Sequence, residues 1–505
     1  IGHNHTRNIR NINNGIQIIF GLLGGLAVFI YGMNMMSECL QKAAGDKMKS
    51  ILALLTKNPL LGVLAGALTT AVLQSSSATT VMAIGFVSAG LMNLPQAISI
   101  IFGANIGTTM TAQIIAFKIS DYIYVIIFIG FLISFVTKSE KVKSIGQTIF
   151  AFGLLFLGIE TMGDVMKPLA SSPVFTDLIG RVAHIPVLGV AVGTFMTLVV
   201  QSSSATIAVL QNFASQPGPD GVTSILGLAG AIPILLGDNI GTTITALLAS
   251  IGQSKDAKRT AVAHCIFNIS GCFLFIWFVK PFAALIQNIS PKGPEIEAIS
   301  RQIANAHTVF NITMTLIWVC LIKLMVKIVM TLIPDGKKGV EDPGSPIYLD
   351  ENIISQPAAA LQLVAKEIFR MSDQVGDILK KTIELVKNEE VKSIDGLKEN
   401  GEQVERLGKC ITEYLAALFS SGSLTEQQAA QTASLMCVLS DVERMGTLSV
   451  EMAECMLERS DRKYKYTPEA MDELQKSLKV LNKMFCDSLK ALQGDDGIEP
   501  GKMMK

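Results

Sequence analysis

Two identical polar hexapeptides, QSSSAT, interrupt the apolar N-terminal part of the chain at residues 74–79 and 201–206. The apolar runs on either side of each are too short to cross a bilayer alone, since a helical span needs about 20 residues. In hydrocarbon, a polar helix break persists only where it is buried in protein or lines a site. We therefore predict two re-entrant hairpins, each made of two half-helices that meet at a QSSS tetrad.

A glutamine and three serines at a helix break can bind ions of either sign. The N–H groups and the positive dipole end of the following half-helix attract an anion, to which serine hydroxyls can also donate. The freed carbonyl and hydroxyl oxygens can instead hold a hard cation such as Na⁺. The alternative is that Ser and Thr serve only close helix packing, but two tetrads in register disfavour it.

A second polar motif, NIGTT, follows each tetrad, in GANIGTTMTA (103–112) and GDNIGTTITA (237–246). Its asparagines supply donors and acceptors, and its threonines supply hydroxyls. We predict that NIGTT interrupts both spans that contain it, and that hairpins and broken spans converge on one central site. Asp238 stands where the first copy has Ala104. An acid at this depth needs a partner such as bound Na⁺, and capping of the helix break is the alternative.

A third pattern, A-x-A-H-x-x-F-N, occurs at 261–268 and again at 304–311. Its His and Asn lie four residues apart, on one face of a helix. Ionisable residues inside a membrane are functional candidates. We expect the asparagines near the site and the histidines to brace the hairpins by hydrogen bonds across helices. Direct contact with a bound anion or proton transfer by the histidines is the alternative. The residues concerned are His264, Asn268, His307 and Asn311.

These motifs belong to a larger internal repeat. Residues 59–79 and 186–206 are identical at 13 of 21 positions, at a constant offset of 127. The membrane part thus divides into two homologous halves, about 15–140 and 141–275, followed by an extra segment at 303–333. The apolar runs predict seven crossings besides the hairpins. An odd number of crossings then separates equivalent points, so we predict inverted repeats in an all-α membrane protein.

The composition supports a membrane protein, with 50% hydrophobic residues, 17% charged residues and a mean hydropathy of +0.44. Lys and Arg gather in loops that the predicted topology places together with the C-terminal part on the cytoplasmic side. Residues 334–350 are rich in Pro and Gly and are predicted to be a linker. Residues 351–492 show apolar residues at helical spacing, which predicts a soluble helical bundle. The net charge of zero gives no argument for nucleic-acid binding.

The paired QSSSAT and NIGTT motifs resemble the type II sodium/phosphate cotransporter family in its bacterial form, over roughly 15–335. The bundle resembles a PhoU-like domain. The resemblance implies Na⁺-coupled symport of inorganic phosphate by alternating access across the bacterial inner membrane. Na⁺ is the implied coupling ion, and no organic cofactor is implied. The implied partners are phosphate and the lipid bilayer, and a homo-oligomer is left open.

By family position, the two tetrads line the phosphate and sodium sites, with the NIGTT residues beside them. The expected phosphate-binding residues are Gln74, Ser75, Ser76, Ser77, Gln201, Ser202, Ser203, Ser204, Asn105 and Asn239. The expected sodium ligands are Ser75, Ser77, Thr79, Ser202, Ser204, Thr206, Thr108, Thr109, Thr242, Thr243 and Asp238.

PhoU-like domains carry acidic motifs that hold metal clusters. The matching acids here are Glu402, Glu405, Asp441 and Glu443, but Thr447 stands where the usual pattern has another acid. A charged helix face is therefore preferred to a metal site.

Two other functions are kept as alternatives. The first is a Na⁺-coupled transporter of another small oxyanion, namely sulfate, arsenate or a dicarboxylate. The second is a membrane phosphate sensor or regulator without net transport. An enzyme is disfavoured, because neither a Ser/His/Asp constellation nor a GxSxG elbow surrounds the serines.

Overall fold

The computed structural model is helical. It describes residues 2–493 except 45–57, 89, 118, 171–179, 183, 219, 335–341, 388–392 and 423. Within these residues there is no β-strand, and the predicted all-α fold is confirmed. The chain forms two compact units that divide after residue 335. The predicted topology relied on basic residues in loops. Three of these, Lys47, Lys49 and Lys57, lie outside the described residues.

Six stretches of the first unit are long and apolar enough to cross a membrane. The helices that contain them are α1 (Gly2–Ala44), α5 (Leu94–Ile115), α7 (Glu140–Ala170), α11 (Gly227–Gly241) continued by α12 (Thr243–Ala249), α13 (Lys255–Ile276) and α15 (Glu295–Cys320).

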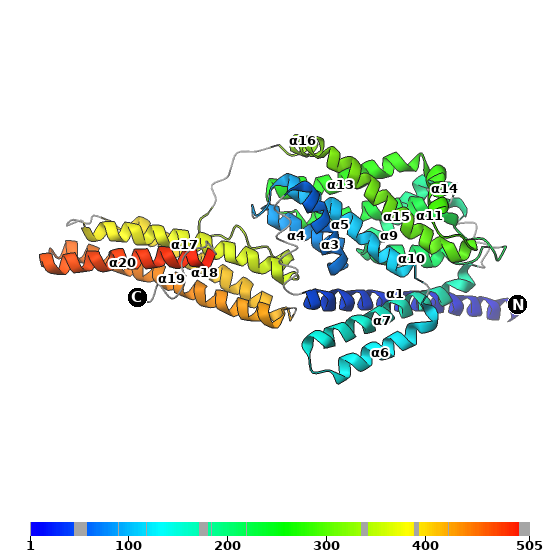
Figure 1. The fold of residues 1–505 in the computed structure, drawn as a ribbon, viewed down its shortest axis with the longest axis horizontal. Coiled ribbons are helices and arrows are strands. Elements are labelled where there is room, and N and C mark those ends of the chain that lie inside the picture. The colour runs from blue at the N-terminus through cyan, green and yellow to red at the C-terminus, as the bar shows by residue number, and fades with distance from the viewer. Residues whose placement is uncertain are drawn as a thin grey trace. The chain divides into compact units, whose positions relative to one another are not determined.

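The seventh predicted crossing, at 121–137, forms the short helices η1 (Ser120–Tyr122) and α6 (Ile123–Val136). With a rise of about 1.5 Å per residue, α6 is shorter than the hydrocarbon core of a bilayer. It packs along α7, which in turn packs along α1 (Figure 1). These three helices form a layer with its own apolar core around Phe29, Leu155 and Met162.

Each QSSS tetrad joins two short helices: α3 (Pro59–Leu73) to α4 (Ser76–Ser88), and α9 (Pro186–Val200) to α10 (Ser203–Ala214). The chain reverses at each tetrad. The Oγ1 atoms of Thr70 and Thr79 are 2.8 Å apart, whereas nine residues of one continuous helix would rise about 13 Å. Thr197 and Thr206 make the same contact at 3.1 Å. The structure thus contains two helical hairpins, and their entry into the bilayer without crossing stays a prediction.

The predicted interruption of the spans at NIGTT is wrong for the first copy, since α5 runs unbroken through it. In the second copy only Thr242 separates α11 from α12, and it keeps right-handed helical angles of φ −60° and ψ −25°. The threonine hydroxyls bond within their own helix. Thr108 donates to the Ala104 carbonyl at 3.0 Å and Thr109 to that of Ile106 at 2.8 Å, which leaves the helix intact.

The glycines before these asparagines serve close packing instead of a break. A Cβ atom at Gly103 would lie 1.9 Å from the Val63 carbonyl oxygen, and one at Gly237 would lie 2.1 Å from that of Val190. Backbone therefore meets backbone where α5 lies along α3 and where α11 lies along α9. Small residues allow such approach between membrane helices, and these contacts set the position of each hairpin along its neighbouring span.

The extra segment predicted at 303–333 is two helices. After α15 the chain turns at Leu321 and continues as α16 (Ile322–Leu332), just as α13 is followed by α14 (Val279–Ile289). Both short helices have 11 residues, and position 279 corresponds to 322 at the same offset that relates His264 to His307. The pair α15–α16 is therefore a second copy of α13–α14.

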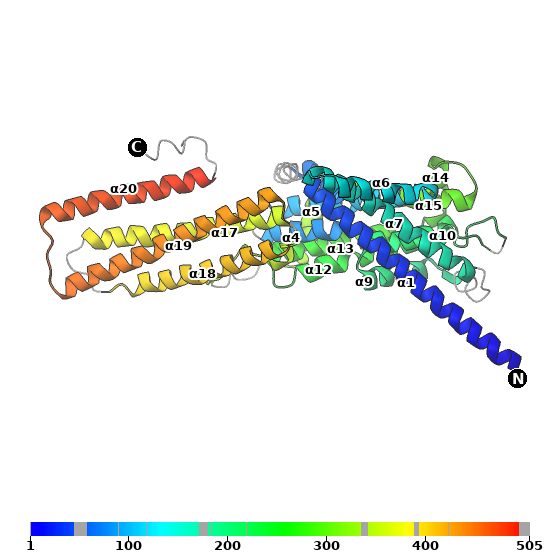
Figure 2. The same cartoon turned by 90° about the horizontal axis from the view of Figure 1, so that it is seen from below.

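The second unit begins with η2 (Glu351–Ile353) and contains four long helices: α17 (Pro357–Lys387), α18 (Asp395–Ser420), α19 (Glu426–Asp461) and α20 (Pro468–Gln493). They lie along one another as a bundle (Figure 2). Residues 342–350 of the predicted linker are attached to α17. The buried Glu367 accepts the N–H groups of Ile347 at 2.9 Å and Tyr348 at 2.6 Å, and it pairs with Arg370 at 2.6 Å.

We expect Gly103→Ala to destabilise the protein, because the new methyl group would push against backbone. Overpacking of this kind costs about 1–3 kcal/mol. The matched control is Gly24→Ala, where a Cβ would meet nothing within 4 Å and the helix would gain propensity. The measurement is the midpoint of thermal unfolding of the purified protein in detergent. Equal midpoints for the two variants would contradict the backbone contact.

Candidate functional site

The two hairpin tips have the same backbone. Gln74 adopts a left-handed conformation with φ 50°, and Gln201 does so with φ 53°. Such angles cost free energy for a residue with a Cβ. The Gln74 side chain is held on both sides, because its amide donates to the Ala71 carbonyl at 2.5 Å and its Oε1 accepts from Thr111 at 3.1 Å. Gln201 is exposed.

The second residue of each tetrad caps the returning helix. Ser75 Oγ accepts the N–H of Ala78, and Ser202 Oγ accepts that of Ala205, both at 3.2 Å. Each first turn still has N–H groups without a helical partner. The tips therefore present helix N-termini and serine hydroxyls together, which suits an anion. The serines that follow the caps are Ser76 and Ser203, 5% and 7% exposed, with Ser77 half-buried and Ser204 buried.

Each NIGTT asparagine is held by a histidine from the third motif. His264 Nε2 lies 3.2 Å from Asn105 Oδ1, and His307 Nε2 lies 3.1 Å from Asn239 Oδ1. Since an amide oxygen only accepts, each histidine donates from Nε2 in these contacts. The histidines thus bond across helices, from α13 to α5 and from α15 to α11.

The two asparagines of the third motif bond to the backbone of the helices that carry the histidines. Asn268 and Asn311 each donate Nδ2 to the carbonyl of the preceding histidine at 3.0 Å. Their Oδ1 atoms have no partner within the described residues, and neither do the Nδ2 atoms of Asn105 and Asn239. Buried polar atoms in folded proteins nearly always have a partner. The site therefore offers two pairs of amide donors and two amide acceptors to a ligand.

Asp238 lies behind the second hairpin and is fully buried. Its Oδ1 accepts from Thr197 at 2.6 Å, and Thr197 also meets Thr206 at 3.1 Å. Its Oδ2 has no partner in the described part of the chain. A buried carboxylate needs a bound cation or a proton. The first half, with Ala104 in this place, instead buries Thr69 and Thr80 with unpartnered hydroxyls.

The remaining sodium candidates divide into two groups. Thr79 and Thr206 lie in the threonine pairs across the hairpins. The NIGTT hydroxyls of Thr108, Thr109, Thr242 and Thr243 all donate to carbonyls of their own helices, so only their oxygen lone pairs remain for a cation. Thr70 and Thr197 were not predicted from the sequence, although they are identical in the aligned repeats.

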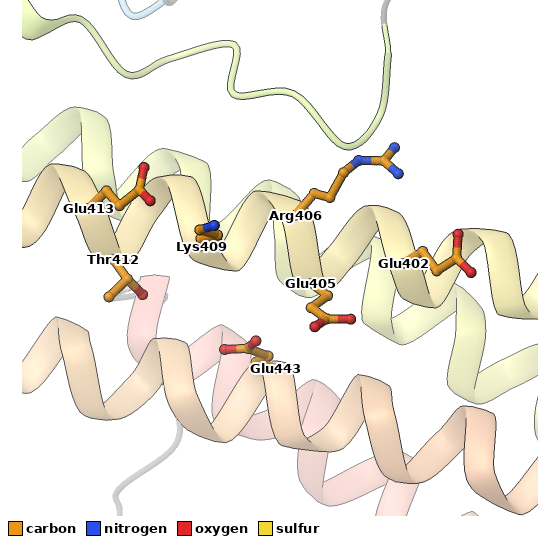
Figure 3. A pocket seen from close by; sticks show the side chains of 7 residues that line it. All are labelled: Glu402, Glu405, Arg406, Lys409, Thr412, Glu413 and Glu443. Carbon is orange, nitrogen blue, oxygen red and sulfur yellow. The ribbon is translucent and has the colours of Figure 1, made fainter.

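Three of the four acidic candidates of the second unit line one groove, and the fourth does not. A groove of about 760 Å³ between α18 and α19 is lined by Glu402, Glu405, Arg406, Lys409, Thr412, Glu413 and Glu443. Figure 3 shows Glu405 and Glu443 facing each other across it, while Arg406 and Glu413 point away. Asp441 does not line the groove. Among the described residues, no three His, Cys, Asp or Glu side chains are placed to hold a metal ion.

We expect Glu443 to make the bundle less stable as the pH rises. Burial, together with the charge of Glu405, raises the pKa of Glu443 above its usual range. A carboxyl with a raised folded-state pKa contributes stability that is complete below about pH 4 and is lost as the pH rises through that pKa. The measurement is hydrogen exchange of peptides from α18 and α19 in the full chain, corrected for the intrinsic pH dependence.

Protection should fall as the pH rises above about pH 4, and Glu443→Gln should flatten this trend. Glu413→Gln, at the rim of the same groove, is the control for a change of charge alone. An identical trend in wild type and Glu443→Gln would show that this carboxyl is not the cause.

Among the described residues, two hairpins and two spans place amide, hydroxyl and carboxylate groups without partners inside a helical membrane unit. This arrangement is typical of secondary transporters with repeated halves. Comparison with known proteins then identifies the family. Residues 28–164 and 162–290 both match the family model described as Na⁺/Pi-cotransporter, and residues 368–456 match the PhoU domain. The chain belongs to the Na⁺/Pi-cotransporter family of phosphate transporters, which confirms the resemblance seen in the sequence.

Three relatives illustrate the match. YqeW of Bacillus subtilis, described as uncharacterized, is 33% identical over 54% of this chain and 87% of its own. YjbB of Salmonella typhimurium, named a putative inorganic phosphate export protein, is 23% identical over 87% of this chain and 78% of its own. The human sodium-dependent phosphate transport protein 2B is 33% identical over 26% of this chain and 19% of its own. No solved structure shows a significant match.

Proposed function

We propose that the protein is a Na⁺-coupled symporter of inorganic phosphate in the bacterial cytoplasmic membrane, with the helical bundle in the cytoplasm. One observation carries the proposal most directly: behind the two hairpin tips, buried amide donors and one buried carboxylate lack protein partners among the described residues. Such a site can take an anion at the amide donors and a cation at the carboxylate. The names of relatives support both parts, since one is sodium-dependent and others are named for phosphate export.

Phosphate would be bound mainly by neutral donors. Near the tips these are the first N–H groups of α4 and α10, the serine hydroxyls, and the Nδ2 groups of Asn105 and Asn239. A neutral donor adds no ion pair to its hydrogen bond with phosphate, unlike an Arg or Lys donor. A site built from them releases its ligand readily, as a transport cycle requires.

Sodium would be bound next to Asp238 in the second half. The free Oδ2 supplies a negative oxygen, and Thr197 and Thr206 bring hydroxyl oxygens beside the other carboxylate oxygen. A bound cation would neutralise the acid and offset the charge of HPO₄²⁻. Alternating access would follow if the hairpin and span of one half move against the hairpin and span of the other half. The two halves have the same backbone arrangement, which is compatible with such a relative movement in either direction.

The test of the proposed function is ³²P-phosphate uptake into proteoliposomes with Na⁺ or K⁺ outside. We expect uptake to require Na⁺ and to fall about tenfold or more in the double variant Ser76→Ala with Ser203→Ala, because each change removes a donor at a tip. The control is Ser134→Ala in α6, a half-buried serine whose hydroxyl donates to the Phe131 carbonyl of its own helix at 2.9 Å.

The outcomes separate the alternatives. Uptake that is indifferent to Na⁺ would remove the sodium coupling. Efflux driven by Na⁺ from loaded vesicles, without uptake, would reverse the direction. Stronger competition by sulfate or a dicarboxylate than by phosphate would change the solute, whereas arsenate should compete at any tetrahedral oxyanion site. Phosphate binding without flux in either direction would favour a sensor.

We expect Na⁺ to stabilise the wild-type protein against heat, and Asp238→Ala to abolish this effect. A ligand present at 100 times its Kd adds about 2.7 kcal/mol to stability. The variant reproduces the Ala104 of the first half and removes the buried oxygen that lacks a partner. The measurement compares thermal midpoints in NaCl and KCl. Asp121→Ala, an exposed acid before α6, is the control, and an undiminished Na⁺ effect in Asp238→Ala would place the cation elsewhere.

A further inference from the structure

One arginine of the membrane unit has no acidic partner among the described residues. Arg301 lies near the start of α15, half-buried against the end of α5. Its Nη1 donates to the Gln113 carbonyl at 3.1 Å and to Gln113 Oε1 at 2.7 Å. Its guanidinium also lies 4.7 Å from the centre of the Phe117 ring. The group is thus held in one orientation by a side chain, a backbone carbonyl and an aromatic face.

The positive charge is left uncompensated in the described part of the chain. Arg259, a buried arginine of the same unit, pairs with Asp256 at 2.7 Å. Arg301 has no carboxylate within 4.0 Å, and its Nε and Nη2 atoms have no protein partner among the residues described. Ionisable groups at this depth normally pair with one another or mark the path of a substrate or ion.

The anchor of Arg301 is itself braced. Gln113 Nε2 donates to Asn305 at 3.1 Å and to Thr308 at 3.0 Å. Asn305 in turn donates to Ser290 at 2.8 Å. The side-chain amide of Gln113 is thus fully hydrogen-bonded. The donors still available next to it are those of the Arg301 guanidinium.

The guanidinium is attached at the level of the first hairpin tip. Thr111, which holds Gln74, precedes Gln113 by two residues of α5, a rise of about 3 Å. The second half has no equivalent: the position that matches Arg301 in α13 is Lys258, which is exposed. One end of the membrane unit therefore carries a held cation at the level of the first tip along α5, whereas the corresponding position in α13 is an exposed lysine.

We propose that Arg301 captures the anion, by attracting it to this end of the unit and forming a charge-assisted contact before it reaches the serine tetrads. The proposal rests on the proposed function. A planar guanidinium with two free donor nitrogens suits a tetrahedral oxyanion. In the proposed topology, the end of the membrane unit that carries Arg301 faces the outside of the cell, from which uptake would start. The structural alternative is that Arg301 only caps the C-terminal end of α5.

The experiment measures initial rates of ³²P-phosphate uptake against phosphate concentration for the full chain in proteoliposomes. Ionic strength is varied with choline chloride at constant Na⁺. The variants are Arg301→Gln, which keeps a donor to Gln113 but no charge, and Arg301→Lys, which keeps the charge but not the fork. Lys258→Gln is the matched control, because it removes a cation at the corresponding position of α13.

Loss of one charge-assisted contact should raise KM about tenfold in Arg301→Gln while kcat stays within about twofold. The wild-type KM should rise with ionic strength, since salt screens the guanidinium, and Arg301→Gln should lose this dependence. Arg301→Lys should keep the salt dependence with an intermediate KM, and Lys258→Gln should match the wild type.

An unchanged KM, a fall in kcat alone, or an equal effect of Lys258→Gln would reduce Arg301 to a helix cap and overturn the proposal. Absence of phosphate uptake by the wild type would refute the proposed function separately. In that case equilibrium dialysis of ³²P-phosphate against the detergent-solubilised full chain decides. Weaker binding by Arg301→Gln than by wild type would uphold the role of Arg301, and equal or absent binding would end it.

Discussion

Burying a polar group without a hydrogen-bond partner costs free energy, and this cost is the main constraint on the structure of the membrane unit. A helix that stops inside an apolar region exposes N–H and carbonyl groups, and each must be paired. At both tetrads the chain achieves this with few residues. Ser75 and Ser202 cap the returning helices, and threonine pairs join the two arms. Behind the tips, amide and carboxylate groups are left unpaired among the described residues, and there a ligand can replace the missing partners.

The two halves share a backbone and differ in chemistry. Both have a left-handed glutamine, a threonine pair, a glycine contact and a His–Asn pair with similar distances. Behind the tips the likeness ends, since Asp238 replaces Ala104, and Met196 and Ile207 replace Thr69 and Thr80. A duplicated scaffold thus positions two unlike sets of groups at equivalent places, so pseudo-symmetry governs the geometry while single substitutions change the groups that each half offers.

The hairpins could be predicted from the sequence, because a polar tetrad between two apolar runs too short to span a bilayer is compatible with few arrangements of the chain. The prediction failed at NIGTT because glycine signals either a break or a close approach, and the partner backbone at Val63 is visible only in three dimensions. The pairing of His264 with Asn105 joins residues 159 positions apart, which no local pattern shows. The identity of Thr70 and Thr197 was readable in the repeat, but their importance depends on Asp238 lying against one of them.

Two buried acids differ in how far the protein itself satisfies them. Glu367 and Asp238 are both fully buried. Glu367 accepts two backbone N–H groups and pairs with Arg370, which satisfies its charge and both oxygens. Asp238 receives one hydroxyl, and its second oxygen has no partner in the described chain. Both carboxylates cost free energy to desolvate, but only that of Glu367 is recovered by the protein itself. The free oxygen of Asp238 therefore needs a cation or a proton, and it is the atom through which this acid can bind a ligand from outside the chain.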